Sequence, residues 1–311
     1  MRSRNPPFWV GDRQFTAEDL VLIIETVRRF KLLSREELAA TLCENLPWKA
    51  PNGKLKLNAC RLLLEGMDSS GIIKLPPKKN QPRRTSNNEP KAKPLPCIAV
   101  EGLLKQYRPV TIDMVEAKEY PLWNATMATY HPLGYRKPFG AHQRYWIRSK
   151  VEGESRILGA ILFAAAAKAV ADRDAWIGWT LLERKRFRYR IVNNSRFLIL
   201  PGVHIPHLAS HVLSLVSRRL RADWFGKYGY APVLLETFVT PPHRGTCYRA
   251  ANLHYIGETA GFSRNRTLGK KSSVPIKMMF AYPLIRNWRT ELCAPTPVAI
   301  DDEEEDTDFD A

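Results

Sequence analysis

The carboxylate of Glu236 interrupts an otherwise apolar run at residues 232–239. Burying a charged carboxylate is costly unless the group is paired or takes part in a reaction. Glu236 could act as a general base, hold a cationic ligand, or form an ion pair with Arg249 or Arg196. The sequence leaves function and pairing open, so Glu236 is a catalytic candidate.

Three histidines, His204, His207 and His211, have the spacing H-x2-H-x3-H. On a helix His207 and His211 would share a face, as in zinc proteases, but the glutamate that follows the first histidine there is missing. We therefore predict no metal and no cofactor. His211 either forms a hydrogen bond in the core or lines a pocket as a catalytic candidate, with His207 and Ser210 as ligand-binding candidates.

Two further groups have both a functional and a structural interpretation. Asn193 and Asn194 precede an apolar run and would either form a turn or point their amides into a site. Cys247 lies near His243 and Glu236 in the sequence, and a thiolate nucleophile needs such a base. Because nothing in the spacing brings them together, a buried structural cysteine is the favoured interpretation of Cys247.

These residues fall at the junctions of a regular series of predicted elements. Residues 196–200 are a strand, and residues 207–220 have the apolar spacing of a helix. A second strand at 232–239, a short helix at 245–253 and a closing strand at 255–257 follow. A strand that leads into a helix beside a second strand forms a natural pocket for an anion or ligand.

The first 75 residues predict a small helical unit. Capping-box patterns start helices at Thr16 and Ser34, a third helix covers residues 55–68, and residues 72–75 look like a strand. Three helices and a β segment outline a winged helix-turn-helix, although an ordinary helical packing module fits equally. In the winged-helix interpretation four residues face a nucleic-acid groove: Lys54, Lys56, Asn58 and Arg61.

The rest of the chain divides into a linker, a larger domain and a tail. Residues 76–96 are rich in proline and basic residues, and residues 97–300 predict one α/β domain with a hairpin turning at residues 152–154. The acidic composition of residues 301–311 predicts a disordered tail. The linker is interpreted equally well as a flexible basic tether without specific contacts or as a nucleic-acid-binding segment that contacts phosphates through Lys78, Lys79, Arg83 and Arg84.

The charge of the chain favours a polyanionic partner. The net charge is +17, and it rises to +25 when the eight acidic residues of the tail are left out. Such a field attracts nucleic acid, with DNA preferred here, although a solubility surface or an acidic protein partner remains open. No apolar run is long enough to cross a membrane, and five scattered cysteines are typical of a cytoplasmic protein.

The order of elements from the hairpin onward resembles the GNAT acyltransferase fold, which implies a mixed-sheet α/β domain. In that family a glycine-rich loop grips coenzyme A, but here His207 replaces the glycine and Pro206 removes an amide. The short helix resembles the one that carries the GNAT tyrosine, which implies a general-acid role for Tyr248. Asn252 at the end of that helix is a further ligand-binding candidate.

A closer resemblance covers nearly the whole chain. Residues 196–201, 208–211, 234–239 and 245–252 resemble the DruA family of the Druantia anti-phage systems, whose relatives accompany transposase genes. The resemblance implies a role in defence or in mobile elements, with defence or transposase proteins as partners. We expect a DNA-binding component; an atypical acyltransferase and a non-catalytic scaffold are the alternatives, and whether the chain is an enzyme stays open.

Overall fold

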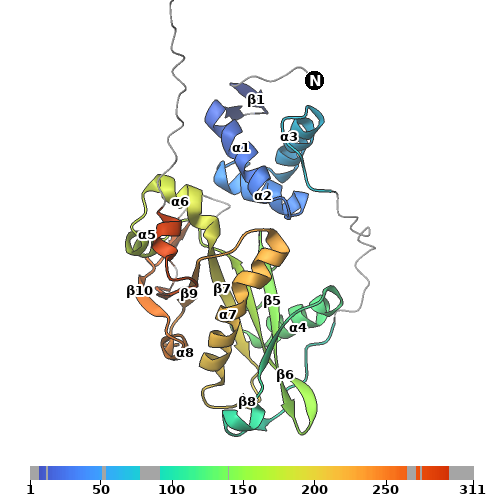
Figure 1. The fold of residues 1–311 in the computed structure, drawn as a ribbon, viewed down its shortest axis with the longest axis vertical. Helices are drawn as coiled ribbons and strands as arrows, with labels where there is room; N and C mark the ends of the chain where they lie inside the picture. The colour runs from blue at the N-terminus through green and yellow to red at the C-terminus, as the bar shows by residue number, and fades with distance from the viewer. Residues whose placement is uncertain are drawn as a thin grey trace, which may run out of the picture.

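The structure is a computed structural model, and it describes residues 7–11, 13–50, 54–77, 92–138, 140–264, 271–273 and 275–293. A small helical unit at the N-terminal end lies on one end of a larger α/β domain (Figure 1). The predicted acidic tail and the linker residues Lys78, Lys79, Arg83 and Arg84 lie outside the described residues.

A seven-stranded mixed sheet organises the α/β domain within the described residues. Its strands run in the order β10-β13-β9-β7-β6-β5-β4. Neighbouring strands are antiparallel except for β7 and β9, which are parallel. The strands are β4 (Thr111–Met114), β5 (His142–Val151), β6 (Glu154–Ala165), β7 (Ile191–Ile199), β9 (Leu234–Val239), β10 (His254–Glu258) and β13 (Met278–Pro283).

The predicted hairpin is confirmed as β5 and β6. The residues at its turn, Glu152 and Gly153, have φ angles of 51° and 83°, which are the positive values that a tight two-residue hairpin turn requires. The parallel pair β7 and β9 needs a crossover, and α7 (Leu208–Tyr228) provides it. The mixed α/β class predicted for this part of the chain is therefore confirmed.

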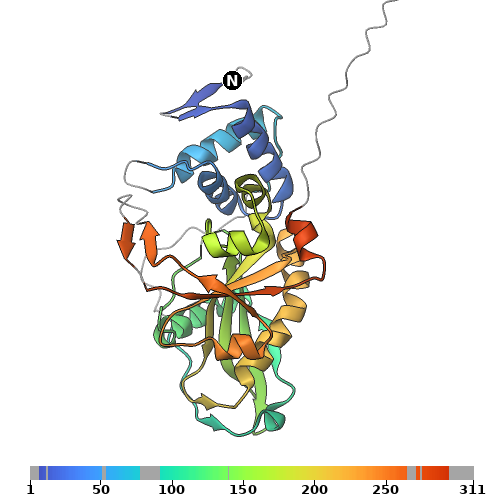
Figure 2. The ribbon, with the colours of Figure 1, turned by 90° about the vertical axis from the view of Figure 1, so that its left-hand side faces the viewer.

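Helices cover both faces of this sheet (Figure 2). On β5, the hydroxyl of Tyr145 donates to Asp223 of α7, whereas the ring of Trp146 packs against Trp123 of α4 (Tyr120–Tyr130). Because adjacent strand residues point to opposite faces, α7 and α4 lie on opposite sides. The other helices of this domain are α5 (Ala171–Ile177), α6 (Leu181–Phe187), α8 (Thr246–Ala250) and α9 (Trp288–Leu292), with 3-10 turns η1 (Leu104–Tyr107), η2 (Ala117–Glu119) and η3 (Arg188–Arg190).

Within the described part of the α/β domain, four short strands lie outside the large sheet. β3 (Val100–Glu101) pairs in parallel with β8 (Val203–His204), and β11 (Phe262–Arg264) pairs with β12 (Lys271–Ser273). Among the described residues no helix is both long and apolar enough to cross a membrane.

The N-terminal unit contains the predicted helices, α1 (Ala17–Arg29), α2 (Arg35–Asn45) and α3 (Leu57–Ser69). Thr16 and Ser34 cap the first two as expected, each in a reciprocal capping box. A hairpin of β1 (Phe8–Val10) and β2 (Arg13–Phe15) precedes α1.

The strand predicted at residues 72–75 is not formed, so the described residues after α3 contain no wing. The backbone N–H of Ile72 bonds to the carbonyl of Met67, and that of Leu75 bonds to the carboxylate of Asp68. These local bonds use donors that a strand would offer to a neighbour. Ile73 and Leu75 are buried in the unit's own core, whereas Ile72 is exposed.

Candidate functional site

The parallel strands β7 and β9 separate at the centre of the sheet. They pair from Ile191 with Leu234 to Asn194 with Thr237, after which β7 continues along β6 and β9 continues along β13. A shift in register at Ser195 accompanies the separation.

Asn194 and Tyr248, two of the predicted site residues, are in contact at this point. The Tyr248 hydroxyl donates to Asn194 Oδ1 at 3.0 Å, and the amide of Asn194 donates to the carbonyls of Leu162 and Arg196. Burial raises the pKa of Tyr248, so its hydroxyl keeps its proton at neutral pH. The proton that a general acid would deliver is thus held by Asn194.

Glu236 points to the opposite face of the sheet. In β9 the neighbouring residue, Thr237, faces Asn194 and donates its hydroxyl to the Asn194 carbonyl. Because strand side chains alternate, the carboxylate of Glu236 extends away from Tyr248. The structure therefore does not bring the predicted general base and general acid together.

Glu236 is 2 % exposed and has an ionic partner that the sequence analysis missed. Its carboxylate accepts from Arg173 Nη1 and from the backbone N–H of Ala167, both at 2.9 Å. Arg173 is itself fully buried, and its Nε and Nη2 donate to Asp174. Arg173, rather than Arg249 or Arg196, is therefore the counter-ion.

The start of α7 holds the predicted His207, Ser210 and His211. His207 adopts a left-handed conformation with φ of 65°, and its carbonyl accepts the Ser210 hydroxyl at 3.1 Å. Burial lowers the pKa of the half-buried His211, and the charges of Arg108 and Arg218 lower it further. Within the described residues no hydrogen bond joins this helix start to Tyr248 or Glu236.

Two remaining candidates lie around α8. Asn252 is exposed, with φ of 63°, just after the helix. Cys247 is half-buried, and burial raises the pKa of its thiol, which opposes formation of the thiolate nucleophile. This environment favours the structural interpretation of Cys247.

The clearest feature beside the diverging strands is a group of basic residues. We define the basic cluster as His131 at the end of α4, Arg136, Arg196 of β7, and His243 in the loop after β9. Burial lowers the pKa of His131 to about 4, and the charges of Arg196 and His243 act in the same direction. Burial also lowers the pKa of Arg196, and Arg136 adds to this effect.

No carboxylate neutralises the basic cluster within the described residues. The Arg196 guanidinium donates to the carbonyls of Gly134 and Ser195 and forms no ion pair. Sequence analysis had singled out neither His131 nor Arg136. A usable signal was present, because residues 131–137 and 240–244 together contain five Lys, Arg or His and no acidic residue.

The nucleic-acid face predicted on α3 is accessible. Lys54, Asn58 and Arg61 are exposed and Lys56 is half-buried. Leu62, next to Arg61, is 70 % exposed, so an apolar side chain shares this surface. The structure is compatible with the predicted face but does not test it.

Comparison with known proteins identifies the family. The model described as "Druantia protein DruA" matches residues 68–269, about two thirds of the chain. The chain belongs to the DruA family. This is a family of anti-phage defence, and the match covers the whole β7–β9 region, with Asn194, Glu236 and Tyr248. No curated protein matches this DruA-family chain.

The solved structures that resemble part of this DruA-family chain include acetyltransferases. A polyamine N-acetyltransferase from Drosophila melanogaster is 11% identical with a TM-score of 0.36, over 56% of this chain and 99% of that one. A GNAT-family acetyltransferase from Bacillus anthracis is 11% identical with a TM-score of 0.35, over 57% and 96%. A spermidine N-acetyltransferase from Vibrio cholerae is 9% identical with a TM-score of 0.33, over 55% and 94%.

Proposed function

We propose that this DruA-family protein is the DNA-binding component of an anti-phage defence system, and that the basic cluster contacts DNA phosphates. The observation that carries the proposal is the group of His131, Arg136, Arg196 and His243, which has no carboxylate among its described neighbours. The charge of Arg136 lowers the pKa of the Arg196 guanidinium, and an anion placed between two such cations stabilises both. Guanidinium groups suit phosphate in particular, because they donate two parallel hydrogen bonds.

The position of the cluster on the sheet follows from the strand register. The cluster lies where β7 and β9 diverge, on the α4 face, because Arg196 pairs with Leu162 of β6, which pairs with Arg144 beside Trp123 of α4. Phe197, the next residue of β7, packs against Tyr248 on the opposite face. The net charge of +17 adds a long-range attraction that steers DNA toward the protein.

The acyltransferase alternative receives less support from the geometry. Its proposed base, Glu236, is bound to Arg173, and its proposed acid, Tyr248, donates to Asn194 on the other face of the sheet. A micromolar dissociation constant for acetyl-CoA, measured by calorimetry, would restore that alternative.

Replacing the exposed Arg136 with glutamine (R136Q) should weaken DNA binding about threefold to tenfold at near-physiological salt. The lost phosphate contact should also reduce the slope of log affinity against log salt by about one. The measurement is fluorescence anisotropy of labelled single- and double-stranded DNA over a salt series. R196Q should have a larger effect, because this guanidinium lies at the centre of the basic cluster.

Arg156→Gln is the matched control. Arg156 is also an exposed arginine, but it pairs with Glu154 at the β5–β6 turn. Its substitution should leave affinity and slope unchanged. If R136Q and R196Q both bind DNA like R156Q, the basic cluster is not the contact surface. R61Q tests the face of α3 separately.

A further inference from the structure

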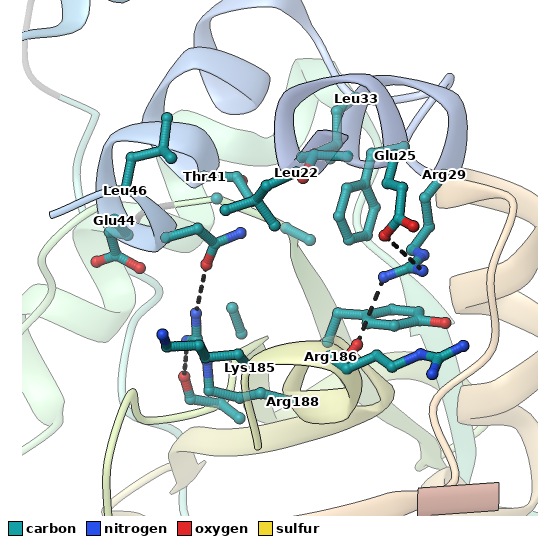
Figure 3. Close-up of a pocket in the computed structure, with 18 of the residues that line it drawn as sticks. Leu22, Glu25, Arg29, Leu33, Thr41, Glu44, Leu46, Lys185, Arg186 and Arg188 are labelled. Carbon is teal, nitrogen blue, oxygen red and sulfur yellow. Dashed lines mark hydrogen bonds and ion pairs between the residues drawn. The ribbon is translucent and has the colours of Figure 1, made fainter. Parts of the chain in front are cut away.

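A cavity of about 730 Å³ lies between the helical unit and the α/β domain (Figure 3). Residues of β2, α1 and α2 line one side, and residues of α6, η3 and the nearby strands line the other. This volume falls within the range of about 300–1,000 Å³ that is usual for small-molecule sites. The cavity is separate from the basic cluster and from the residues at the β7–β9 separation.

The α6–η3 side of the cavity carries Lys185, Arg186 and Arg188. None of the three forms an ion pair with a described carboxylate. Arg188 donates to the carbonyl of Ala166 and to the side-chain oxygen of Asn45, and Arg186 Nη1 is buried with no described hydrogen-bond partner. Lys185 is exposed. This wall therefore offers donors and positive charge that no described ion pair neutralises, although Glu44 partly offsets the lowering of the Arg188 pKa by burial.

Positive charge also accumulates around the rim. Lys168 donates to the Glu44 carbonyl, which joins the two units. Burial lowers the pKa of Lys168, and the charges of Arg188, Lys49 and Arg184 lower it further against the opposing effect of Glu44. An anion bound at this wall would relieve the mutual repulsion of these cations.

The opposite wall has different chemistry. It carries carboxylates from α1 and α2, of which Asp19 is bound by Arg13 and Glu25 lies 3.9 Å from Arg29. Glu18 and Glu44 also line this wall. Carboxylate oxygens accept hydrogen bonds from hydroxyl and amino groups. A ligand that spans the cavity therefore needs an anionic end and a separate set of donors.

Aromatic rings form the inner part of the cavity. Phe30 of α1, Tyr189 of η3 and Tyr230 lie with centroids 5.1 to 5.4 Å apart and hold the two units together. Arg29 stacks over the Tyr189 ring at 4.7 Å and donates to the Arg186 carbonyl. These rings present apolar surface to a planar group.

We propose that this cavity binds a nucleoside phosphate. Its phosphates would contact Lys185 and Arg188, which lie side by side in Figure 3. Its ribose hydroxyls and amino groups would face the carboxylates of α1 and α2, and its base would pack on the aromatic rings. One ligand would thus bridge the helical unit and the α/β domain. This proposal is independent of DNA binding at the basic cluster.

The test is calorimetry of the full chain with ATP, GTP, adenosine and pyrophosphate as separate probes. At least one nucleoside triphosphate should bind with a micromolar dissociation constant, and more tightly than adenosine or pyrophosphate. K185Q should weaken that binding severalfold. The contact of Arg188 with Asn45, which joins the two units, is retained in this variant.

R156Q is again the control for loss of one positive charge and should bind like the wild type. R136Q should keep nucleotide binding while its DNA binding weakens, which separates failure of this inference from failure of the proposed function. Absence of binding by both triphosphates would overturn the inference. Equal binding of pyrophosphate and the triphosphates, or unchanged binding in K185Q, would overturn it as well.

Discussion

Arg173→Met should destabilise the protein by about 3–5 kcal/mol, because it leaves the buried carboxylate of Glu236 without its counter-ion. Arg173 is fully buried, and its side chain donates to Glu236, to Asp174 and to the carbonyl of Ala167. Methionine fills much of the same volume but compensates none of these acceptors. The measurement is the free energy of unfolding from urea denaturation at neutral pH.

Glu236→Gln is the informative comparison. Glutamine keeps one acceptor oxygen, for either Arg173 or the N–H of Ala167, and Arg173 keeps Asp174 as a counter-ion, so this variant should lose less stability than Arg173→Met. The double variant has no buried Glu236 charge left to compensate. Its loss in the free energy of unfolding should therefore be smaller than the sum of the losses in the two single variants. Additive losses, or a loss below about 1 kcal/mol for Arg173→Met, would contradict a buried ion pair as the role of Glu236.

Glu236 illustrates which features of the site could be predicted from the sequence and which could not. An acidic residue in an apolar strand correctly indicated a group that needs a partner. The partner lies 63 residues earlier in the chain, on α5, and no local pattern connects the two. Which face of β9 carries Glu236 depends on the register of β9 beside β7, and this register fixes Thr237 against Asn194.

Sequence patterns predicted those elements that are determined by residues within the element itself. The hairpin of β5 and β6 follows from its turn residues, the starts of α1 and α2 follow from their capping boxes, and the apolar spacing of α7 indicated the crossover. The composition of residues 72–75 is typical of a strand. No strand forms there because backbone donors of this segment bond to Met67 and Asp68 of α3.

The basic cluster and the cavity could not be predicted in the same way. His131, Arg196 and His243 come from three separate segments, and only the folded sheet brings them together. The cavity depends on how the helical unit lies on α6 and η3, through contacts such as that of Arg188 with Asn45. A pattern within one segment carries no information on such contacts between segments.

The free energy of unfolding should fall by up to about 3 kcal/mol between pH 6.5 and pH 4 through His142 alone. His142 is buried at the start of β5, and its Nδ1 lies 2.9 Å from the Gly140 carbonyl. Burial lowers the pKa of His142 from 6.5 to about 4, with Arg144 and Lys227 acting in the same direction against the Gly140 hydrogen bond. In the unfolded chain His142 binds a proton near pH 6.5, whereas in the folded chain it binds one only near pH 4. The free energy of unfolding therefore declines as the pH falls from 6.5 to 4.

His142→Gln removes this proton-binding difference while its amide can still donate to the Gly140 carbonyl. Urea denaturation of both proteins from pH 7 to pH 4 should show the variant less stable at pH 7, with the gap narrowing or reversing toward pH 4. The exposed His204 provides the control, since His204→Gln should leave the wild-type pH dependence unchanged. Parallel curves for the wild type and His142→Gln would show that His142 is protonated alike in the folded and unfolded chains, and the acid sensitivity would then belong to other groups.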